Sequence, residues 1–252
     1  MKKTMTALVV CLALCLGSLV QASAMSVKDL TYITEQYPPY NFKDQGELKG
    51  IAVDVLEAMF DEMNVGLGKG DIKLLPWAKG YDLAQNDPGT VLFSTTRSEA
   101  RENMFKWVGP IAPTKISLVA RKDSNVSISS IDDVKQYTVG VIRDDIGQQL
   151  LEEAGVSTSS LDIVSRADSN IKKLSRGRVD AWAYEETVAM WLIKSEGLDP
   201  ADFEPVHTLS ESQLYFAFHM ATPDALIEEF QQALDAVKDS GQYQQVMDTY
   251  LK

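Results

Sequence analysis

Residues 95–110 of the chain read TTRSEARENMFKWVGP and directly follow the apolar run Val91-Leu92-Phe93. This apolar run has the composition of a buried strand. Two arginines, Arg97 and Arg101, stand four residues apart just after it, although the chain is strongly acidic, with a formal net charge of −12. At a strand end, a guanidinium can offer two parallel donors to a carboxylate. Either the arginines pair with the acids of their own segment, or one of them holds an anionic guest.

Residues 1–24 have the three parts of a secretory signal peptide. The parts are a basic start, an apolar run and a small-residue cleavage site: Lys2-Lys3, Met5 through Val20, and Ala22-Ser23-Ala24. The apolar run is short for a helix that spans a bilayer, although a retained membrane anchor is the alternative. We expect cleavage after Ala24 and a soluble, exported protein in the periplasm.

The composition argues against several classes of site. Cys11 and Cys15 both lie inside the expected signal peptide, so we expect the mature protein to have no disulfide, thiolate metal site or cysteine nucleophile. The two histidines, His207 and His219, are twelve residues apart, which is not typical of a metal site. An acidic surface repels nucleic acid and anionic lipid headgroups. We expect no metal, no cofactor and no nucleic-acid partner.

From residue 30 onward, short apolar runs alternate with segments of helical periodicity. This order predicts an α/β fold with mostly parallel strands. The expected strands cover residues 30–34, 72–75, 91–93, 116–120, 137–141, 161–164, 181–183 and 214–218. The expected helices cover residues 51–63, 78–86, 131–134, 148–153, 169–176, 186–195, 226–237 and 243–250.

The same arrangement starts again after the strand at 116–120, which predicts two α/β lobes with a cleft between them. We expect lobe 1 to contain residues 25–113 and 206–252, and lobe 2 to contain residues 114–205. Two short crossings, near Pro113-Thr114 and Pro205-Val206, would act as a hinge. Ligands of such sheets bind outside the carboxyl ends of the strands.

Four motifs follow one another along the chain. They are Tyr37-Pro38-Pro39-Tyr40-Asn41-Phe42 with the segment 46–55 (GELKGIAVDV), Thr96 through Pro110, Val179-Asp180-Ala181 with Glu185, and Asp239 through Tyr243. In order and spacing they resemble the periplasmic solute-binding proteins of the polar amino acid type, the bacterial extracellular solute-binding proteins of family 3. The resemblance implies a two-lobed type II periplasmic binding fold. It also implies a monomer that captures a small zwitterionic solute by cleft closure, without catalysis, for the membrane permease of an ABC importer.

The resemblance also implies a division of the ligand contacts between the lobes. Arg101 would hold the carboxylate of the guest, with Ser94 and Thr96 adding hydroxyl or backbone contacts. Glu185, from the opposite lobe, would hold the ammonium group. The alternative for Arg97 is an ion pair on a solvated turn, which we favour for this residue. For Glu185 the alternative is a water-facing position beside the start of the next helix.

Aromatic residues at family positions would wall the cleft. Tyr37 and Trp77 are expected to do so. Tyr81, Trp182 and Tyr184 also lie at such positions but are equally consistent with ordinary core or rim positions. Trp107 and Trp191 are expected in the core.

One loop departs from the family pattern. Where the family has a glycine and then a hydroxyl residue, this chain has Asp144 and Asp145. An aspartate beside a guest carboxylate would be repulsive. Either the loop turns away, or the guest carries extra positive charge, or the guest is not a plain α-amino acid. The two acids could also cap the helix that contains Gln148.

Two other functions fit the same scaffold. Some members of the fold family are periplasmic dehydratases of the cyclohexadienyl or arogenate type, in which a cleft carboxylate is the general acid; Glu185 could take that role if burial raised its pKa. A ligand sensor that presents its bound guest to a membrane receptor is the second alternative.

Overall fold

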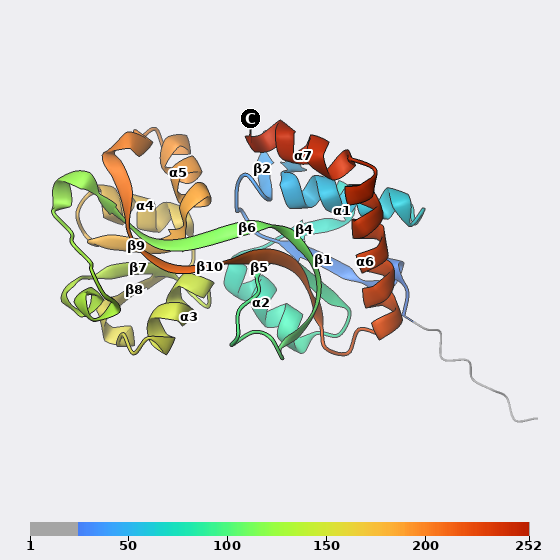
Figure 1. Cartoon of the computed structure of the whole chain (residues 1–252), viewed down its shortest axis with the longest axis horizontal. Helices are drawn as coiled ribbons and strands as arrows, with labels where there is room; N and C mark the ends of the chain where they lie inside the picture. The colour runs from blue at the N-terminus through green and yellow to red at the C-terminus, as the bar shows by residue number, and fades with distance from the viewer. Residues whose placement is uncertain (1–24, 252) are drawn as a thin grey trace, which may run out of the picture.

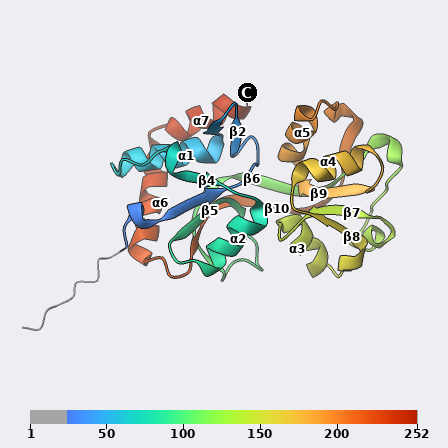
Figure 2. The same ribbon diagram turned by 180° about the vertical axis from the view of Figure 1, so that it is seen from behind.

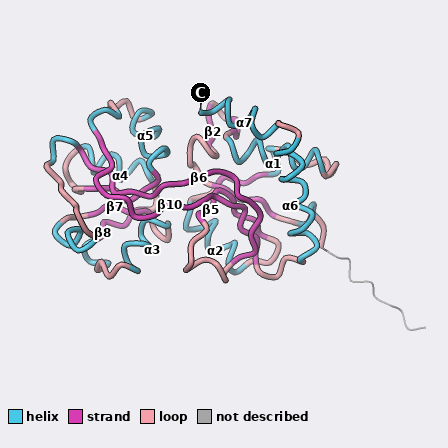
Figure 3. The backbone as a smooth tube through the Cα atoms, in the orientation of Figure 1, coloured by secondary structure: helices cyan, strands magenta, loops and turns pink. Residues whose placement is uncertain are grey.

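A computed structural model describes residues 25–251, so the expected signal peptide lies outside the described residues. The described chain forms two lobes that lie side by side (Figure 1) and remain distinct when seen from behind (Figure 2). Strands run as a continuous band through both lobes, with helices on either side of the band (Figure 3). The predicted two-lobed α/β fold is therefore confirmed.

Lobe 1 is built on the parallel strands β4, β1 and β5, in that spatial order. Helices α1, α6 and α7 cover one face of this sheet and α2 covers the other (Figures 1 and 2). The lobe contains η1 (Val27–Asp29), β1 (Thr31–Thr34), β2 (Phe42–Asp44), β3 (Glu47–Lys49), α1 (Ile51–Glu62), η2 (Lys69–Asp71), β4 (Ile72–Leu74), α2 (Trp77–Asn86), β5 (Thr90–Thr96), α6 (Asp224–Asp239) and α7 (Gln242–Leu251).

Lobe 2 repeats the plan with β9, β7 and β8, in which β7 pairs in parallel with both neighbours. Helices α4 and α5 lie on one face and α3 on the other (Figure 1). The lobe contains η3 (Lys122–Ser124), η4 (Ile131–Gln136), β7 (Val139–Ile142), α3 (Ile146–Glu153), η5 (Thr158–Ser160), β8 (Leu161–Val164), α4 (Ala167–Ser175), β9 (Ala181–Glu185), α5 (Glu186–Ser195) and η6 (Pro200–Asp202).

Two long antiparallel strands, β6 (Phe105–Arg121) and β10 (Phe203–His219), connect the lobes. Only 116–120 and 214–218 were expected as strands, so both strands are much longer than predicted. Prolines interrupt the sequence pattern of both strands, and residues 204–213 of β10 are half-buried or exposed. The apolar alternation that marks a strand is therefore missing from the connecting part.

The register of these strands shows how each lobe joins the sheet. β6 pairs with β9 of lobe 2 from Ile116 onward, and β10 pairs with β5 of lobe 1 from Leu214 onward. Between these points, Pro113 faces Gln213 and the two strands pair only with each other. The predicted lobe limits, 25–113 with 206–252 and 114–205, stay a prediction. The register favours a return crossing beyond Val206, close to Gln213.

Helix α1 shows why the sheet is stable. Its apolar residues Ile51, Val55, Leu56, Met59 and Phe60 have no exposed surface. They pack between the sheet and helices α6 and α7. Each fully buried side chain of this size contributes about 1.5–3 kcal/mol, so this helix is a main source of the stability of lobe 1.

The turn before α1 requires glycine at position 50. Gly50 has φ +127°, and a Cβ there would lie 2.5 Å from the backbone oxygen of Tyr40. Gly46 has φ +94° in the nearby hairpin turn, but a Cβ there would meet no atom within 4 Å. A substitution at Gly46 therefore tests backbone strain alone, whereas a substitution at Gly50 tests strain together with a steric clash.

We expect Gly50→Ala to lower the free energy of unfolding by about 2–4 kcal/mol, because strain and a backbone clash act together. Gly46→Ala, the matched control, should lose about 1 kcal/mol from strain alone. Urea unfolding followed by circular dichroism measures both. Equal losses in the two variants would contradict the close approach at Gly50.

Candidate ligand-binding cleft

A cavity of about 600 Å³ lies between the lobes. Lobe 1 contributes the two residues after β1 and the segment that leads from β4 into α2. Lobe 2 contributes the end of β7, the start of α4, the end of β9 and one side of α5. The lining residues are Glu35, Gln36, Leu74, Leu75, Pro76, Trp77, Ile142, Ser165, Arg166, Ala167, Asp168, Tyr184, Trp191, Leu192, Ser195 and Glu196. Of the predicted site residues, Trp77 and Tyr184 are in this lining.

The aromatic residues connect the lobes as well as walling the cavity. Trp77 begins α2, and its indole Nε1 donates a hydrogen bond of 2.8 Å to the backbone oxygen of Asp144 in lobe 2. The ring of Tyr37 meets the ring of Tyr184 edge-on at 5.5 Å, and Tyr184 in turn stacks on Trp182 at 4.4 Å. The wall is therefore rigid on the lobe 2 side, where two rings are stacked.

Trp191 was predicted in the core, and that prediction is wrong. It is 37% exposed, lines the cavity from α5, and contacts the ring of Phe42 from lobe 1 at 5.2 Å. Tyr81 and Trp182, for which two positions were open, are both buried in the core.

Arg101 is buried, with 1% of its surface exposed. Its guanidinium spans the cleft: Nε donates to Oε1 of Gln149 in lobe 2 at 2.9 Å, and Nη1 donates to the backbone oxygen of Thr96 at 3.2 Å. Nη2 makes a longer contact of 3.5 Å with the backbone oxygen of Asp144. The group also lies 5.0 Å from the ring centroid of Tyr81, within the range of a cation–π interaction.

The first arginine of the segment behaves as predicted. Nε of Arg97 donates to Glu102 at 2.7 Å, and the pair is partly exposed. Arg97 therefore pairs with Glu102 of its own segment, whereas Arg101 contacts Gln149 of lobe 2.

Ser94 and Thr96 lie at the carboxyl end of β5 and are both buried. Ser94 has φ +58°, a left-handed conformation that is uncommon for serine. Among the described residues, the Ser94 hydroxyl has no hydrogen-bond partner. A buried hydroxyl without a partner costs free energy, and strained residues of this kind gather at ligand sites. Both features suit a residue that meets a guest.

The loop that departs from the family pattern turns its first acid outward. Asp144 is exposed and has φ +60°, which explains why a glycine suits this position in the family. Asp145 is buried and occupies the N-cap position of α3, so the predicted capping position is confirmed for Asp145. Burial raises the pKa of Asp145, although the nearby Arg101 charge and the N–H groups of Ile146 and Gly147 act in the opposite direction.

Glu185 ends β9 and is the N-cap residue of α5. It is 2% exposed, so the water-facing alternative is wrong. Its Oε2 accepts a hydrogen bond of 2.7 Å from the backbone N–H of Val188. Burial raises the pKa of Glu185 to about 7, and the backbone donors, including Val188, lower it in part.

Glu35 lines the cavity and was not predicted. It directly follows β1, at the carboxyl end of a parallel strand. Burial is the main cause that raises the pKa of Glu35 well above its ordinary value, and the charge of Asp145 adds to the effect, while that of Arg101 opposes it. The sequence signal that could have identified Glu35 is its position directly after a buried strand, because ligands bind at the edge of the sheet where the parallel strands end.

The described residues contain no group of three or more metal-ligating side chains that could hold an ion. None of the helices in residues 25–251 combines the length and the apolar composition needed to cross a membrane.

Two known proteins are similar in sequence to this chain. The probable amino-acid-binding protein YxeM of Bacillus subtilis (strain 168) is 27% identical over 228 residues, covering 86% of this chain and 81% of its own length. The arginine-binding periplasmic protein of Mannheimia haemolytica is 25% identical over 255 residues, covering 100% of this chain and 99% of its own length.

The fold is similar to that of a histidine kinase sensor domain with similarity to periplasmic binding proteins. The two share a TM-score of 0.76 at 22% identity, over 88% of this chain and 96% of the other. The family model of the bacterial extracellular solute-binding proteins, family 3, matches residues 30–252. Because this match covers nearly the whole described chain, the protein belongs to the bacterial extracellular solute-binding proteins of family 3.

Proposed function

We propose that this protein captures a small amino-acid-like solute in the cleft between its lobes and delivers it to the membrane permease of an ABC importer. The observation that carries this proposal is the cavity of about 600 Å³ that both lobes line and that Trp77 and Tyr184 wall. A volume of this size suits a small solute. The family, and the names of the two relatives as amino-acid-binding and arginine-binding proteins, support the class of solute.

Closure of the cleft would couple binding to delivery. The hydrogen bonds from Trp77 to Asp144 and from Arg101 to Gln149 join side chains of one lobe to the other, so both must break when the lobes separate. A guest that contacts both lobes adds free energy to the closed state alone and shifts the population toward it. A permease that recognises the closed shape would then receive only loaded protein.

The proposed contacts of the guest remain those of the sequence prediction. A guanidinium has five N–H donors, and three of those of Arg101 point at protein acceptors, which leaves two for a guest carboxylate. Glu185 has one oxygen engaged with Val188 and would offer the other to an ammonium group. Ser94 and Thr96 would add contacts beside Arg101.

The proposed setting is the periplasm, after removal of residues 1–24, with the protein acting as a monomer. A sensory role would use the same closed shape, with a membrane receptor in place of the permease.

The raised pKa of Glu185, about 7, is the observation that favours a dehydratase. A general acid needs a pKa near the working pH. However, prephenate-like substrates carry two carboxylates, and three buried or partly buried acids, Glu35, Asp145 and Glu185, lie around Tyr184. Binding a dianion there would require these acids to be protonated, whereas an ammonium group would favour their ionised form. The amino-acid-binding relatives support a binding protein without catalysis as the proposal.

A thermal shift screen tests solute capture. We expect one or more polar amino acids to raise the melting temperature of the purified protein, and small-angle X-ray scattering to show a smaller radius of gyration with that solute. If none of the twenty amino acids or their simple amine derivatives raises the melting temperature, the proposed function fails.

Arg101→Met should weaken binding of the identified solute by about 10- to 100-fold in titration calorimetry, because charge-assisted hydrogen bonds are lost. Arg101→Lys keeps the charge without the planar fork and should fall between that variant and the native protein. Arg97→Met is the matched control from the same segment and should change the affinity less than about twofold, since exposed pairs contribute little. Equal losses at both positions would contradict the assigned role of Arg101.

Glu185→Gln should alter how stability depends on pH in the ligand-free protein. With a folded-state pKa of about 7, the native carboxyl keeps its proton between about pH 4.5 and 7, where the unfolded chain has lost it. Stability from this group is therefore lost as the pH rises through that window, by at most about 3 kcal/mol. Glutamine does not titrate, so the variant should gain stability relative to the native protein from pH 5 to pH 8. A difference in unfolding free energy that stays constant over this range would be the contrary result.

A further inference from the structure

Gln149 lies in α3 and was not predicted as a site residue. Its Oε1 accepts from Nε of Arg101 at 2.9 Å, and its Nε2 donates to the hydroxyl of Tyr81 at 3.4 Å and to the backbone oxygen of Asp144 at 3.1 Å. Arg101 and Tyr81 belong to lobe 1, whereas Asp144 lies in lobe 2 beside the amide. One side chain of lobe 2 is therefore bonded to two side chains of lobe 1, and these contacts of Gln149 are called the amide clamp below.

The chemistry of its partners fixes the orientation of this amide. A guanidinium N–H needs an acceptor and a backbone carbonyl needs a donor, so the oxygen of Gln149 has to face Arg101 and the amino group has to face Asp144. The reversed amide would place donor against donor and acceptor against acceptor. The amide clamp therefore has one arrangement in the closed cleft.

Two aromatic rings attract the guanidinium of Arg101 but leave its direction open. The Cζ atom of Arg101 lies 5.3 Å from the ring centroid of Trp77 and 5.0 Å from that of Tyr81. A cation–π interaction acts over the face of a ring and does not select the direction of each N–H group. Hydrogen bonds at the edge of the guanidinium select it, and the bond to Gln149 is the shortest of the three.

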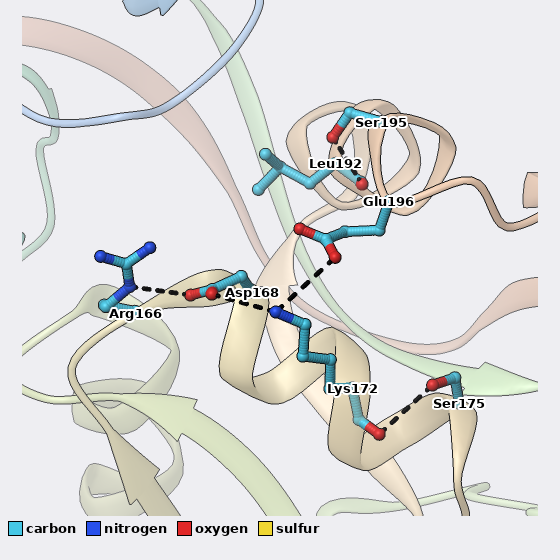
Figure 4. A network of polar contacts seen from close by, with 7 residues as sticks. All are labelled: Arg166, Asp168, Lys172, Ser175, Leu192, Ser195 and Glu196. Atoms are coloured by element: carbon cyan, nitrogen blue, oxygen red, sulfur yellow. Dashed lines mark hydrogen bonds and ion pairs between the residues drawn. The ribbon is translucent and has the colours of Figure 1, made fainter.

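The acceptors of Arg101 are neutral oxygens, in contrast to those of two cations of lobe 2. Arg166 donates to the Asp168 carboxylate at 2.9 Å (Figure 4). Lys172 lies 3.4 Å from Asp168 and 3.8 Å from Glu196 (Figure 4). Within residues 25–251, no carboxylate lies at ion-pair distance from Arg101. A neutral acceptor orients a guanidinium without cancelling its charge, so the charge of Arg101 is not taken up by a direct ion pair.

The amide clamp lies beside the cavity. Trp77 lines the cavity, whereas Arg101 and Gln149 are not in the lining. The bonds of the clamp join protein groups alone, so they need no guest in order to form. Because Gln149 has partners on both lobes, these bonds are lost when α2 and α3 move apart.

We propose that Gln149 is a positioning residue of this cleft. Its amide holds the Nε side of Arg101, which directs the remaining N–H groups of Nη1 and Nη2 toward a guest carboxylate. The same bonds favour closed lobes before a guest is bound. The positioning of Arg101 rests on the proposed function, because it needs a guest that this guanidinium holds, whereas closure of the ligand-free protein does not.

Gln149→Met tests the amide clamp, because methionine keeps the length and the helix propensity of glutamine and removes its hydrogen-bonding groups. In the ligand-free state, we expect the variant to have a larger radius of gyration than the native protein in small-angle X-ray scattering. We also expect its affinity for the identified solute to fall about tenfold in titration calorimetry, because the guanidinium is no longer held in one direction.

Gln85→Met is the matched control. Gln85 is also a half-buried glutamine, but its Nε2 donates to the backbone oxygen of Tyr81 at 3.1 Å, within α2 of lobe 1. Losing this bond removes nothing that joins the lobes. The radius of gyration should stay at the native value, and the affinity should stay within about twofold.

Gln149→Glu separates closure from the positioning of charge. A carboxylate keeps an acceptor opposite Nε of Arg101, so the ligand-free variant should be as compact as the native protein. The new acid also cancels the guanidinium charge and repels a guest carboxylate, so the affinity should fall at least about tenfold. A glutamine that only packs between the helices predicts no such split between compactness and affinity.

A ligand-free Gln149→Met protein that is as compact as the native protein would overturn the clamp, and so would a Gln85→Met variant that opens the lobes equally. A Gln149→Glu variant with an affinity within about twofold of the native value would overturn the positioning of Arg101. If no amino acid binds to the native protein, the proposed function and the positioning of Arg101 are both wrong. The scattering comparison of the ligand-free proteins still decides in that case whether Gln149 holds the lobes together.

Discussion

The backbone oxygen of Asp144 is the point on which the closed cleft depends. It accepts the indole N–H of Trp77 at 2.8 Å and the side-chain amide of Gln149 at 3.1 Å, and the guanidinium of Arg101 approaches it at 3.5 Å. Two of these three donors belong to lobe 1 and the third belongs to lobe 2. This one carbonyl oxygen of lobe 2 is therefore contacted by donors from both lobes. Asp144 has a left-handed conformation, with φ +60°, which costs about 1–2 kcal/mol. Hydrogen bonds across the cleft offset this cost only when the lobes are together.

A second constraint is the excess of acid over base inside the cleft. Asp145 occupies the N-cap position of α3 without a side-chain cap hydrogen bond, and Glu185 caps α5 by accepting from Val188 N–H. Two of the acids therefore lie at helix N-termini, where the backbone N–H groups stabilise negative charge. Glu35 has no such support, since it follows a strand rather than starting a helix. The two capping acids have a structural reason to be present without a guest.

Much of this arrangement could be predicted from the sequence, and the failures have physical causes. Helix α1 and strand β1 follow from local periodicity, because their apolar side chains repeat at the spacing of the element. The length of β6 and β10 could not be predicted, since both carry prolines and the connecting part of β10 is half-buried or exposed. Trp191 was assigned to the core, whereas the side of α5 that carries it opens onto the cavity.

The site residues also divide into those that the sequence predicted and those that it could not. Arg101 was found through motif spacing and Trp77 through its position in the family, but their bonds to lobe 2 are tertiary contacts that no local pattern contains. Glu35 belongs to none of the quoted motifs, and a single acid after a strand is common. The position of Glu35 at the edge where the parallel strands end indicates a ligand contact. This signal becomes specific only when the order of the strands in the sheet is known.

A crystal structure of the protein with its bound solute would test the central claim most directly. The account predicts that the guest lies in the cavity between Trp77 and Tyr184, with the bond from Trp77 to the Asp144 oxygen intact. A guest bound outside this cavity, or a closed complex in which Trp77 no longer reaches Asp144, would contradict it.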